Sequence, residues 1–228
     1  MIFEIDKVRF IEDKIKDPFS KYRNDIEEFW EMYQKNNPGS YSERILNVFD
    51  INRIDQYFTL NISWINFYEA LYSKLTGNIK TRTLFSGGYI KTGDGYYCLA
   101  LDKNEHINLI GGVSSCNDVK DGIYDPKHCL IREFIEEIGV DIRQDAYNCD
   151  MKYIKIPDDN EIYSPVGLIY EIMTDRTRNE LETRFANTNH DDELKMLRFF
   201  DQDERELFRL NKRRPYINDL FELVFKKA

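Results

Sequence analysis

One short helix between residues 125 and 140 limits most strongly how this chain can fold. Asp125 is a good N-cap, Pro126 suits the first helical turn, where no amide donor is needed, and Gly139 can adopt the left-handed conformation that ends a helix. The sequence therefore predicts a helix from Pro126 to Ile138. Its apolar residues lie four apart and form a stripe that must be buried: Leu130, Phe134 and Ile138.

Three glutamates lie on another face of the same helix. Glu133, Glu136 and Glu137 are three and four residues apart, a spacing at which like charges repel and destabilise a helix. A bound cation would remove that cost, and clustered carboxylate oxygens are the ligands that Mg²⁺ and Mn²⁺ prefer. Arg132, four residues before Glu136, can pair with it and fix its rotamer. Taken alone, three such glutamates are more often a solvated acidic face than a metal site.

A resemblance to a known family favours the metal site. The run from Arg132 to Val140 resembles the second half of the Nudix signature, Arg-Glu-U-x-Glu-Glu-x-Gly-U, where U is bulky and apolar, and all seven specified positions match. Gly111 and Gly112 resemble the glycine pair that opens this signature, whose backbone would shape the phosphate site of the substrate. The resemblance implies an α/β/α sandwich, and an enzyme that holds divalent metal against a diphosphate and hydrolyses nucleoside diphosphates linked to another group.

The same resemblance implies roles for individual side chains. Glu136 and Glu137 would bind Mg²⁺ or Mn²⁺ directly, while Glu133 would be a further metal ligand or would orient the attacking water. Arg132 would orient Glu136 in the catalytic site without touching the substrate. The expected partner is a small-molecule nucleotide.

The chain departs from the family pattern between the two halves of the signature. The pattern places five residues between its glycine and its first glutamate and seven more before the arginine, whereas nineteen residues separate Gly112 from Arg132. Counting back eight residues from Arg132 reaches Tyr124, so we expect the first signature glutamate to be absent. Either Asp121 takes its role or the role is unfilled. The segment 114–124 has no apolar periodicity and is expected to be a mobile loop that closes over the ligand. The acids nearest to Tyr124, the position of the absent glutamate, are Asp118, Asp121 and Asp125.

The polar loop before Leu194 offers a candidate for the catalytic base. In the Nudix family an acid just before a Leu-Arg-aromatic strand often supplies it, and Glu193, with Asp192 next, best resembles that acid. Tyr124 is a poor alternative, because a phenol accepts a proton weakly at neutral pH. We expect Glu193 rather than Asp121, since a residue beside a strand is held more firmly than one on a long loop. Without the family, such an acid is usually a solvated loop charge.

The composition excludes several classes of protein. A net charge of −9 argues against a broad basic face for long nucleic acid or for an anionic membrane surface. The four cysteines include no Cys-x-x-Cys pair, which suits a reducing compartment rather than a zinc site. The first residues lack a signal-peptide core, and no apolar run approaches the roughly 18 residues of a membrane span. We expect a cytoplasmic, soluble protein, with a homodimer left open.

The chain length suits one domain of about 130 to 150 residues and an extension. We predict an α+β N-terminal extension over residues 1–75, a Nudix-like α/β/α sandwich with a mixed sheet over residues 76–203, and a helical C-terminal tail over residues 204–228. Strands are predicted at residues 2–5, 44–51, 56–63, 81–90, 96–101, 107–110, 151–156, 163–173 and 194–201. Helices are predicted at residues 17–34, 64–75, 126–138, 202–210 and 215–226, with a helical turn at 179–185.

Two other classes of function stay open. A Nudix-like fold can bind a nucleotide as a regulator without cleaving it, and the missing signature glutamate and the longer loop favour this reading. The extension could instead bind a partner, as in an interaction protein. The intact set of Glu133, Glu136 and Glu137 favours the enzyme, because a carboxylate cluster costs stability when no metal binds to it.

Overall fold

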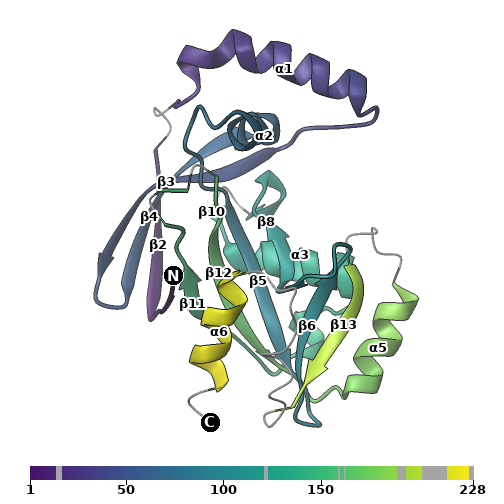
Figure 1. Cartoon of the computed structure of the whole chain (residues 1–228). Helices are drawn as coiled ribbons and strands as arrows, with labels where there is room; N and C mark the ends of the chain where they lie inside the picture. The colour runs from purple at the N-terminus through teal and green to yellow at the C-terminus, as the bar shows by residue number, and fades with distance from the viewer. Residues whose placement is uncertain are drawn as a thin grey trace.

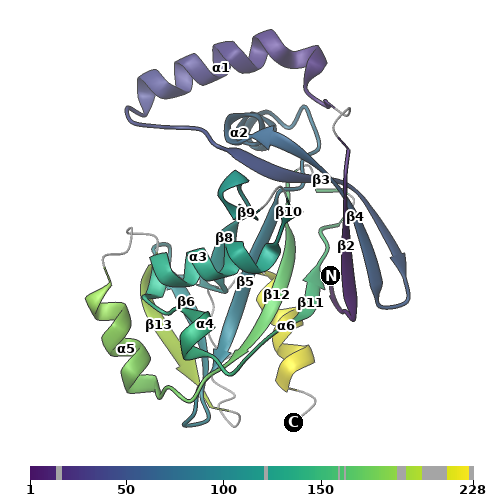
Figure 2. The same ribbon diagram turned by 180° about the vertical axis from the view of Figure 1, so that it is seen from behind.

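The main body of the chain is a mixed β-sheet with helices on both faces (Figure 1, Figure 2). The structure is a computed structural model and describes residues 1–13, 17–120, 123–158, 160–161, 163–188, 194–201 and 215–225. The strands of the sheet are β1 (Ile2–Glu4), β5 (Leu84–Lys91), β6 (Tyr97–Asp102), β7 (Ile107–Asn108), β8 (Ile110–Val113), β11 (Asn148–Lys155), β12 (Val166–Met173) and β13 (Leu194–Phe200).

The sheet order brings together strands that are far apart in the sequence. The strands follow the order β1-β11-β12-β5-β6-β13, while β7 pairs with β6 and β8 pairs with β5. β12 and β5 are parallel, and the other pairs are antiparallel. A parallel pair requires a crossover connection, and here the crossover carries the helix predicted at residues 126–138. The predicted α/β fold with a mixed sheet is confirmed.

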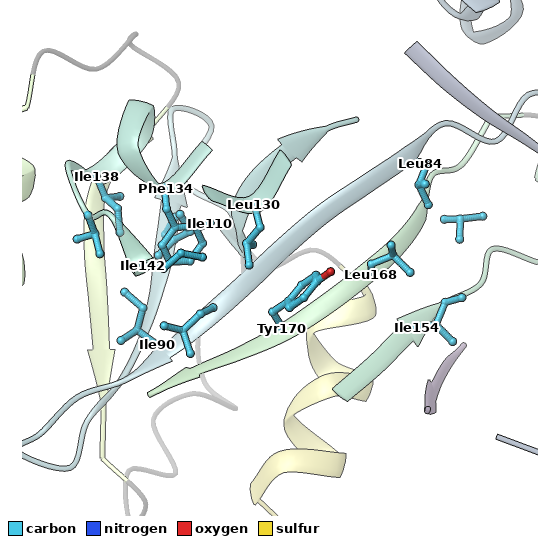
Figure 3. Packing of buried hydrophobic residues seen from close by; sticks show 14 of the residues in the cluster. Leu84, Ile90, Ile110, Leu130, Phe134, Ile138, Ile142, Ile154, Leu168 and Tyr170 are labelled. Carbon is cyan, nitrogen blue, oxygen red and sulfur yellow. The ribbon is translucent and has the colours of Figure 1, made fainter. Parts of the chain in front are cut away.

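Helix α3 (Pro126–Ile138) covers one face of the sheet. Its residues Leu130 and Phe134 lie in one buried cluster with Leu84 of β5 and Leu168 of β12 (Figure 3). Burying this stripe is what holds the helix in place, since a helix of this length is marginal in water by itself. The same cluster takes in side chains of α4 (Ile142–Asp145) and α5 (Arg178–Asn187).

Helix α6 (Pro215–Phe225) covers the opposite face. Leu220 and Phe221 lie in a second buried cluster with Leu99 of β6, and Phe85 of β5 packs against it. Phe85 and its neighbour Leu84 therefore serve different layers, because successive side chains of a strand point to opposite faces. No helix among the described residues is both long and apolar enough to cross a membrane.

The local signals that predicted α3 are all present. Its bounds are those predicted, and the Asp125 carboxylate accepts a hydrogen bond from the amide of Lys127 at 2.9 Å. Pro126 is the first helical residue, and Gly139 ends the helix at φ 67° in the left-handed region. Because each of these contacts is local, the sequence was sufficient to predict this helix.

The N-terminal part contains a second, smaller sheet in the order β2-β4-β3. Its side chains are not separate from the main body, since Val48, Leu60 and Ile62 belong to the cluster under α3. Strand β1 joins the main sheet beside β11. The division of the chain at residues 75 and 203 stays a prediction. The elements of this part are β2 (Lys7–Glu12), α1 (Arg23–Asn36), β3 (Arg44–Ile54), β4 (Tyr57–Asn66) and α2 (Phe67–Thr76).

Several predicted bounds were wrong for identifiable reasons. The helix predicted from residue 17 begins at Arg23, after a 3₁₀ turn. The helix predicted from Trp64 begins at Phe67, because β4 continues to Asn66, whose amide donates to the Glu69 carboxylate at 2.6 Å and so caps α2. The strand predicted at 107–110 is two strands, β7 and β8. The helix predicted at 202–210 lies outside the described residues.

The segment predicted as an irregular loop at residues 114–124 is built from short regular elements. It contains a 3₁₀-helix, η2 (Cys116–Asp118), followed by the hairpin of β9 (Val119–Lys120) and β10 (Ile123–Tyr124). A capping box at Ser115 holds the start of η2. The first half of the segment is therefore tied to the protein core rather than being a free lid.

Phe134 is expected to be the residue of α3 on which the packing of the helix depends most. It is fully buried, whereas its neighbour Ile135 is 40% exposed on the same helix. We expect Phe134→Ala to lower the free energy of unfolding by about 3–5 kcal/mol, and Ile135→Ala to change it by less than about 0.5 kcal/mol. Denaturant titrations of the two variants test this, and equal losses would contradict the assigned packing.

Candidate active site

The glycine pair of β8 lets two neighbours approach the strand closely, β5 at Gly111 and α3 at Gly112. Gly111 has φ 142°, and a Cβ there would lie 2.2 Å from the carbonyl oxygen of Ser86. A Cβ on Gly112 would lie 2.3 Å from Oε1 of Glu133. The amide of Gly111 donates to Oε2 of Glu137 at 2.9 Å. Two of the predicted metal ligands thus lie against the two glycines predicted to shape the substrate site.

Arg132 lies at the centre of an ion-pair network. Its Nη1 donates to Glu133 at 2.7 Å and to Glu136 at 3.2 Å, so the predicted pair with Glu136 is present. Its Nε and Nη2 donate to the two carboxylate oxygens of Asp118 at 3.0 and 3.2 Å. Burial lowers the pKa of Arg132, but Asp118 and Glu133 outweigh that effect and the net pKa is raised. Arg132 therefore stays charged and holds the carboxylates in position.

Asp118 is a residue of this site that the sequence prediction did not single out. Five residues lie between Gly112 and Asp118, which is the family spacing when it is counted forward from the glycine. A signature glutamate is absent, as predicted, but its position is filled by this shorter acid. The six extra residues, 119–124, all follow it, and those of them that the structure describes form the paired strands β9 and β10. Counting from both ends of the insertion would have found this acid.

The surroundings of Asp118 make it a structural partner. Its side chain is buried, pairs with Arg132 through both oxygens, and accepts the amide of Ser115 at 2.8 Å. Both of its oxygens accept bonds from within the protein, so it holds Arg132 and the start of η2 in position. Tyr124, reached by counting backwards, bonds instead to Oγ of Ser114 at 2.6 Å. Asp121 lies outside the described residues.

The three glutamates of α3 have different environments. The Glu133 side chain is 14% exposed, and burial raises its pKa to about 7 against the lowering effect of Arg132. The Glu136 side chain is 58% exposed. A carboxyl with a pKa near 7 can exchange a proton at neutral pH or bind a cation. Glu133 is therefore suited to either of its two predicted roles, metal ligand or the group that orients the attacking water.

The donor set of α3 fits a hard divalent cation by its chemistry, since all of its donors are carboxylate oxygens. Within the described residues, no three such side chains are gathered around one point. Glu133 and Glu136 are both directed to Arg132, and Glu137 is directed to the amide of Gly111. Glu193 and Asp192, the predicted base and its neighbour, lie outside the described residues.

A cavity of about 520 Å³ lies on the other side of the glycine pair. Gly111 and Gly112 line it together with Phe85 of β5, Lys155 at the end of β11 and Tyr216 of α6. It thus lies next to the layer of the sheet that α6 covers, while the glutamates approach β8 from α3. The two glycines of β8, which have no side chains, separate the carboxylates from a cavity large enough for a small ligand.

Comparisons with known proteins show the fold. No family model and no curated protein sequence matches the chain. Tm1382, classed as a Nudix hydrolase, aligns with a TM-score of 0.52 and 16% identity over 82% of this chain and 100% of its own. A bifunctional NMN adenylyltransferase/ADP ribose pyrophosphatase from Francisella tularensis aligns with a TM-score of 0.50 and 12% identity, over 70% of this chain and 45% of that enzyme. The fold expected from the signature is therefore confirmed.

The buried pair of Asp118 and Arg132 is expected to contribute to stability. Asp118→Asn leaves the guanidinium without its main partner, and we expect a loss of about 3 kcal/mol, the low end for a broken buried pair because Arg132 is partly exposed. Asp125→Asn, which keeps a good N-cap, should stay within about 0.5 kcal/mol of the native protein. Chemical denaturation measures both, and a neutral Asp118→Asn would contradict the structural role.

Proposed function

We propose that this chain is a divalent-metal-dependent hydrolase that cleaves a phosphoanhydride bond in a nucleoside diphosphate linked to another group, such as a nucleotide sugar. The observation that carries the proposal is the contact of Glu133 and Glu137 with Gly111 and Gly112, which also line the cavity. Negative side chains brought this close together cost free energy; Arg132 offsets part of their charge, and a bound divalent cation would offset the rest.

Each side chain has a proposed part in the reaction. Glu136 and Glu137 would hold Mg²⁺ or Mn²⁺, and Glu133 would be a further ligand or would orient the attacking water. The bound ion would polarise the phosphoryl oxygens and lower the pKa of its water. Arg132 would position Glu133 and Glu136 without touching the substrate, since its donors are directed to carboxylates. The glycine backbone would leave room for the phosphates.

Two facts support a nucleotide substrate rather than another phosphoanhydride. The Francisella tularensis enzyme, which shares the fold, was solved with AMP and a manganese ion. The cavity beside the glycines also has aromatic side chains, on which a planar base can stack. The alternative of a non-catalytic regulator draws support from the absent signature glutamate and the longer loop. Asp118 stands at the position of that glutamate but pairs with Arg132, so the substrate screen below decides between the two functions.

A substrate screen tests the proposal directly. The full chain would be incubated with nucleotide sugars, dinucleotides, ADP-ribose and nucleoside triphosphates, with Mg²⁺ and with a chelator, and the products identified by mass spectrometry. We expect metal-dependent release of a nucleoside monophosphate from at least one of them. Binding without turnover would identify a regulator, and neither binding nor turnover would favour an interaction protein.

The metal site is expected to show in both activity and stability. Glu136→Gln and Glu137→Gln each remove a charge with little change in volume, so we expect most turnover to be lost while the fold is kept. Mg²⁺ or Mn²⁺ should raise the melting temperature of the native protein, because a metal concentration one hundred times Kd adds about 2.7 kcal/mol to the free energy of unfolding. The metal should not raise the melting temperature of the double variant. Glu182→Gln, an exposed glutamate of α5, is the control. Equal melting shifts in all proteins would contradict the site.

The base is expected to be Glu193 rather than an acid of the inserted segment. Glu193→Gln should lower turnover by about a hundredfold or more, with little change in metal affinity, because a lost general base removes rate and not binding. Asp121→Asn should cost less than about tenfold. Steady-state rates at saturating metal test the ranking. The reverse order would move the base to the segment before α3, and near-native rates in both would leave Glu133.

A further inference from the structure

The cavity beside the glycine pair has two aromatic walls. Phe85 of β5 and Tyr216 of α6 have ring centroids 6.2 Å apart and planes tilted by 51°. Aromatic faces bind planar heterocycles by stacking, and this attraction distinguishes little between one base and another. Selection among bases must therefore come from polar groups at the edge of the ring.

Lys155 is the one basic side chain among the described residues that line the cavity. Its Nζ donates to the carbonyl oxygen of Pro165 at 2.9 Å and to Oγ of Ser164 at 3.2 Å, and lies 5.4 Å from the ring centroid of Tyr216. An ammonium carries three N–H donors, so among the described residues one donor is left beyond these two bonds. Because its position is held at several points, Lys155 can direct that donor with little loss of entropy.

Carboxylates line the same cavity as this donor. Asp158, Glu161 and Asp219 belong to its lining, and the charges of Glu161 and Asp158 act on Lys155. The cavity therefore offers a charged donor and charged acceptors to one ligand.

We infer that this cavity binds a nucleobase with a lactam edge, a carbonyl beside an N–H, as in guanine, hypoxanthine and uracil. The carbonyl oxygen accepts from Lys155, and the adjacent N–H donates to Glu161 or Asp158. Adenine and cytosine carry an amino group and a bare ring nitrogen at this edge, so donor would face donor and acceptor would face acceptor. The inference rests on the proposed function, because the base belongs to the substrate whose phosphates lie at the glycine pair.

Binding to the intact chain tests the inference without any need for catalysis. GDP, inosine diphosphate and UDP would be compared with ADP and CDP by calorimetry, with Mg²⁺ and without it. We expect the lactam bases to bind at least about tenfold more tightly, the effect of one hydrogen bond to a charged group. Equal or tighter binding of ADP or CDP, or no binding of any of the five, would overturn the inference.

The two proposals fail in different ways. If the base preference is present and no substrate is cleaved, the proposed hydrolysis is wrong and the cavity assignment holds. If metal-dependent hydrolysis occurs with no preference between lactam and amino bases, the cavity assignment is wrong and the hydrolase holds.

Variants of Lys155 test whether this side chain causes the preference for lactam bases. Lys155→Met keeps the stem and removes the ammonium, so binding of GDP should weaken about tenfold while binding of ADP stays unchanged. Lys152→Met, on the same strand and paired with Asp150 at 3.1 Å, is the matched control and should change neither. An unchanged preference in a folded Lys155→Met protein overturns the assignment. If that variant fails to fold, the double variant Asp158→Asn/Glu161→Gln, at two exposed positions, should lose the preference instead.

Discussion

The close approach of α3 to β8 is the constraint on which the rest of the site depends. It depends on the missing side chain of Gly112, where a single added carbon would meet the Glu133 carboxylate, while Gly111 makes the corresponding room for β5. The apolar stripe of α3 sets the height of the helix above the sheet, and the glycines let its acidic face reach the strand. Core packing and carboxylate placement are therefore two results of one geometry.

The charges at this junction differ greatly in what they contribute. The pair of Arg132 with Glu136 is exposed, and such pairs contribute about 0–1 kcal/mol. The pair with Asp118 is largely desolvated, and breaking a pair of that kind costs several kcal/mol. Asp118 thus holds Arg132, and Arg132 in turn holds Glu133 and Glu136. A single buried acid supports the arrangement of a more exposed acidic surface.

The features that could be predicted from the sequence are those whose interacting residues lie close together in the chain. The bounds of α3 were predicted to the residue, because its caps are adjacent in the chain. The pairing of β1 with β11 joins residues about 150 positions apart, and no local pattern marks it. Asp118 lies between these cases. Counting forward from Gly112 with the family spacing reaches Asp118. Counting back from its partner Arg132 reaches Tyr124 instead, because six inserted residues lie between the two.

The same difference between near and distant residues applies to the carboxylates of α3 and to the residues that line the cavity. The carboxylates come from one turn of one helix, so a short motif is enough to find them. The cavity is assembled from β5, β8, β11 and α6, and Phe85, Lys155 and Tyr216 have no spacing in common. On the proposed assignment, a change at Lys155 alters which base is bound and leaves the contacts of Glu133 and Glu137 with β8 untouched. The glycines between the two groups would then let the recognition of the base vary independently of the proposed hydrolysis.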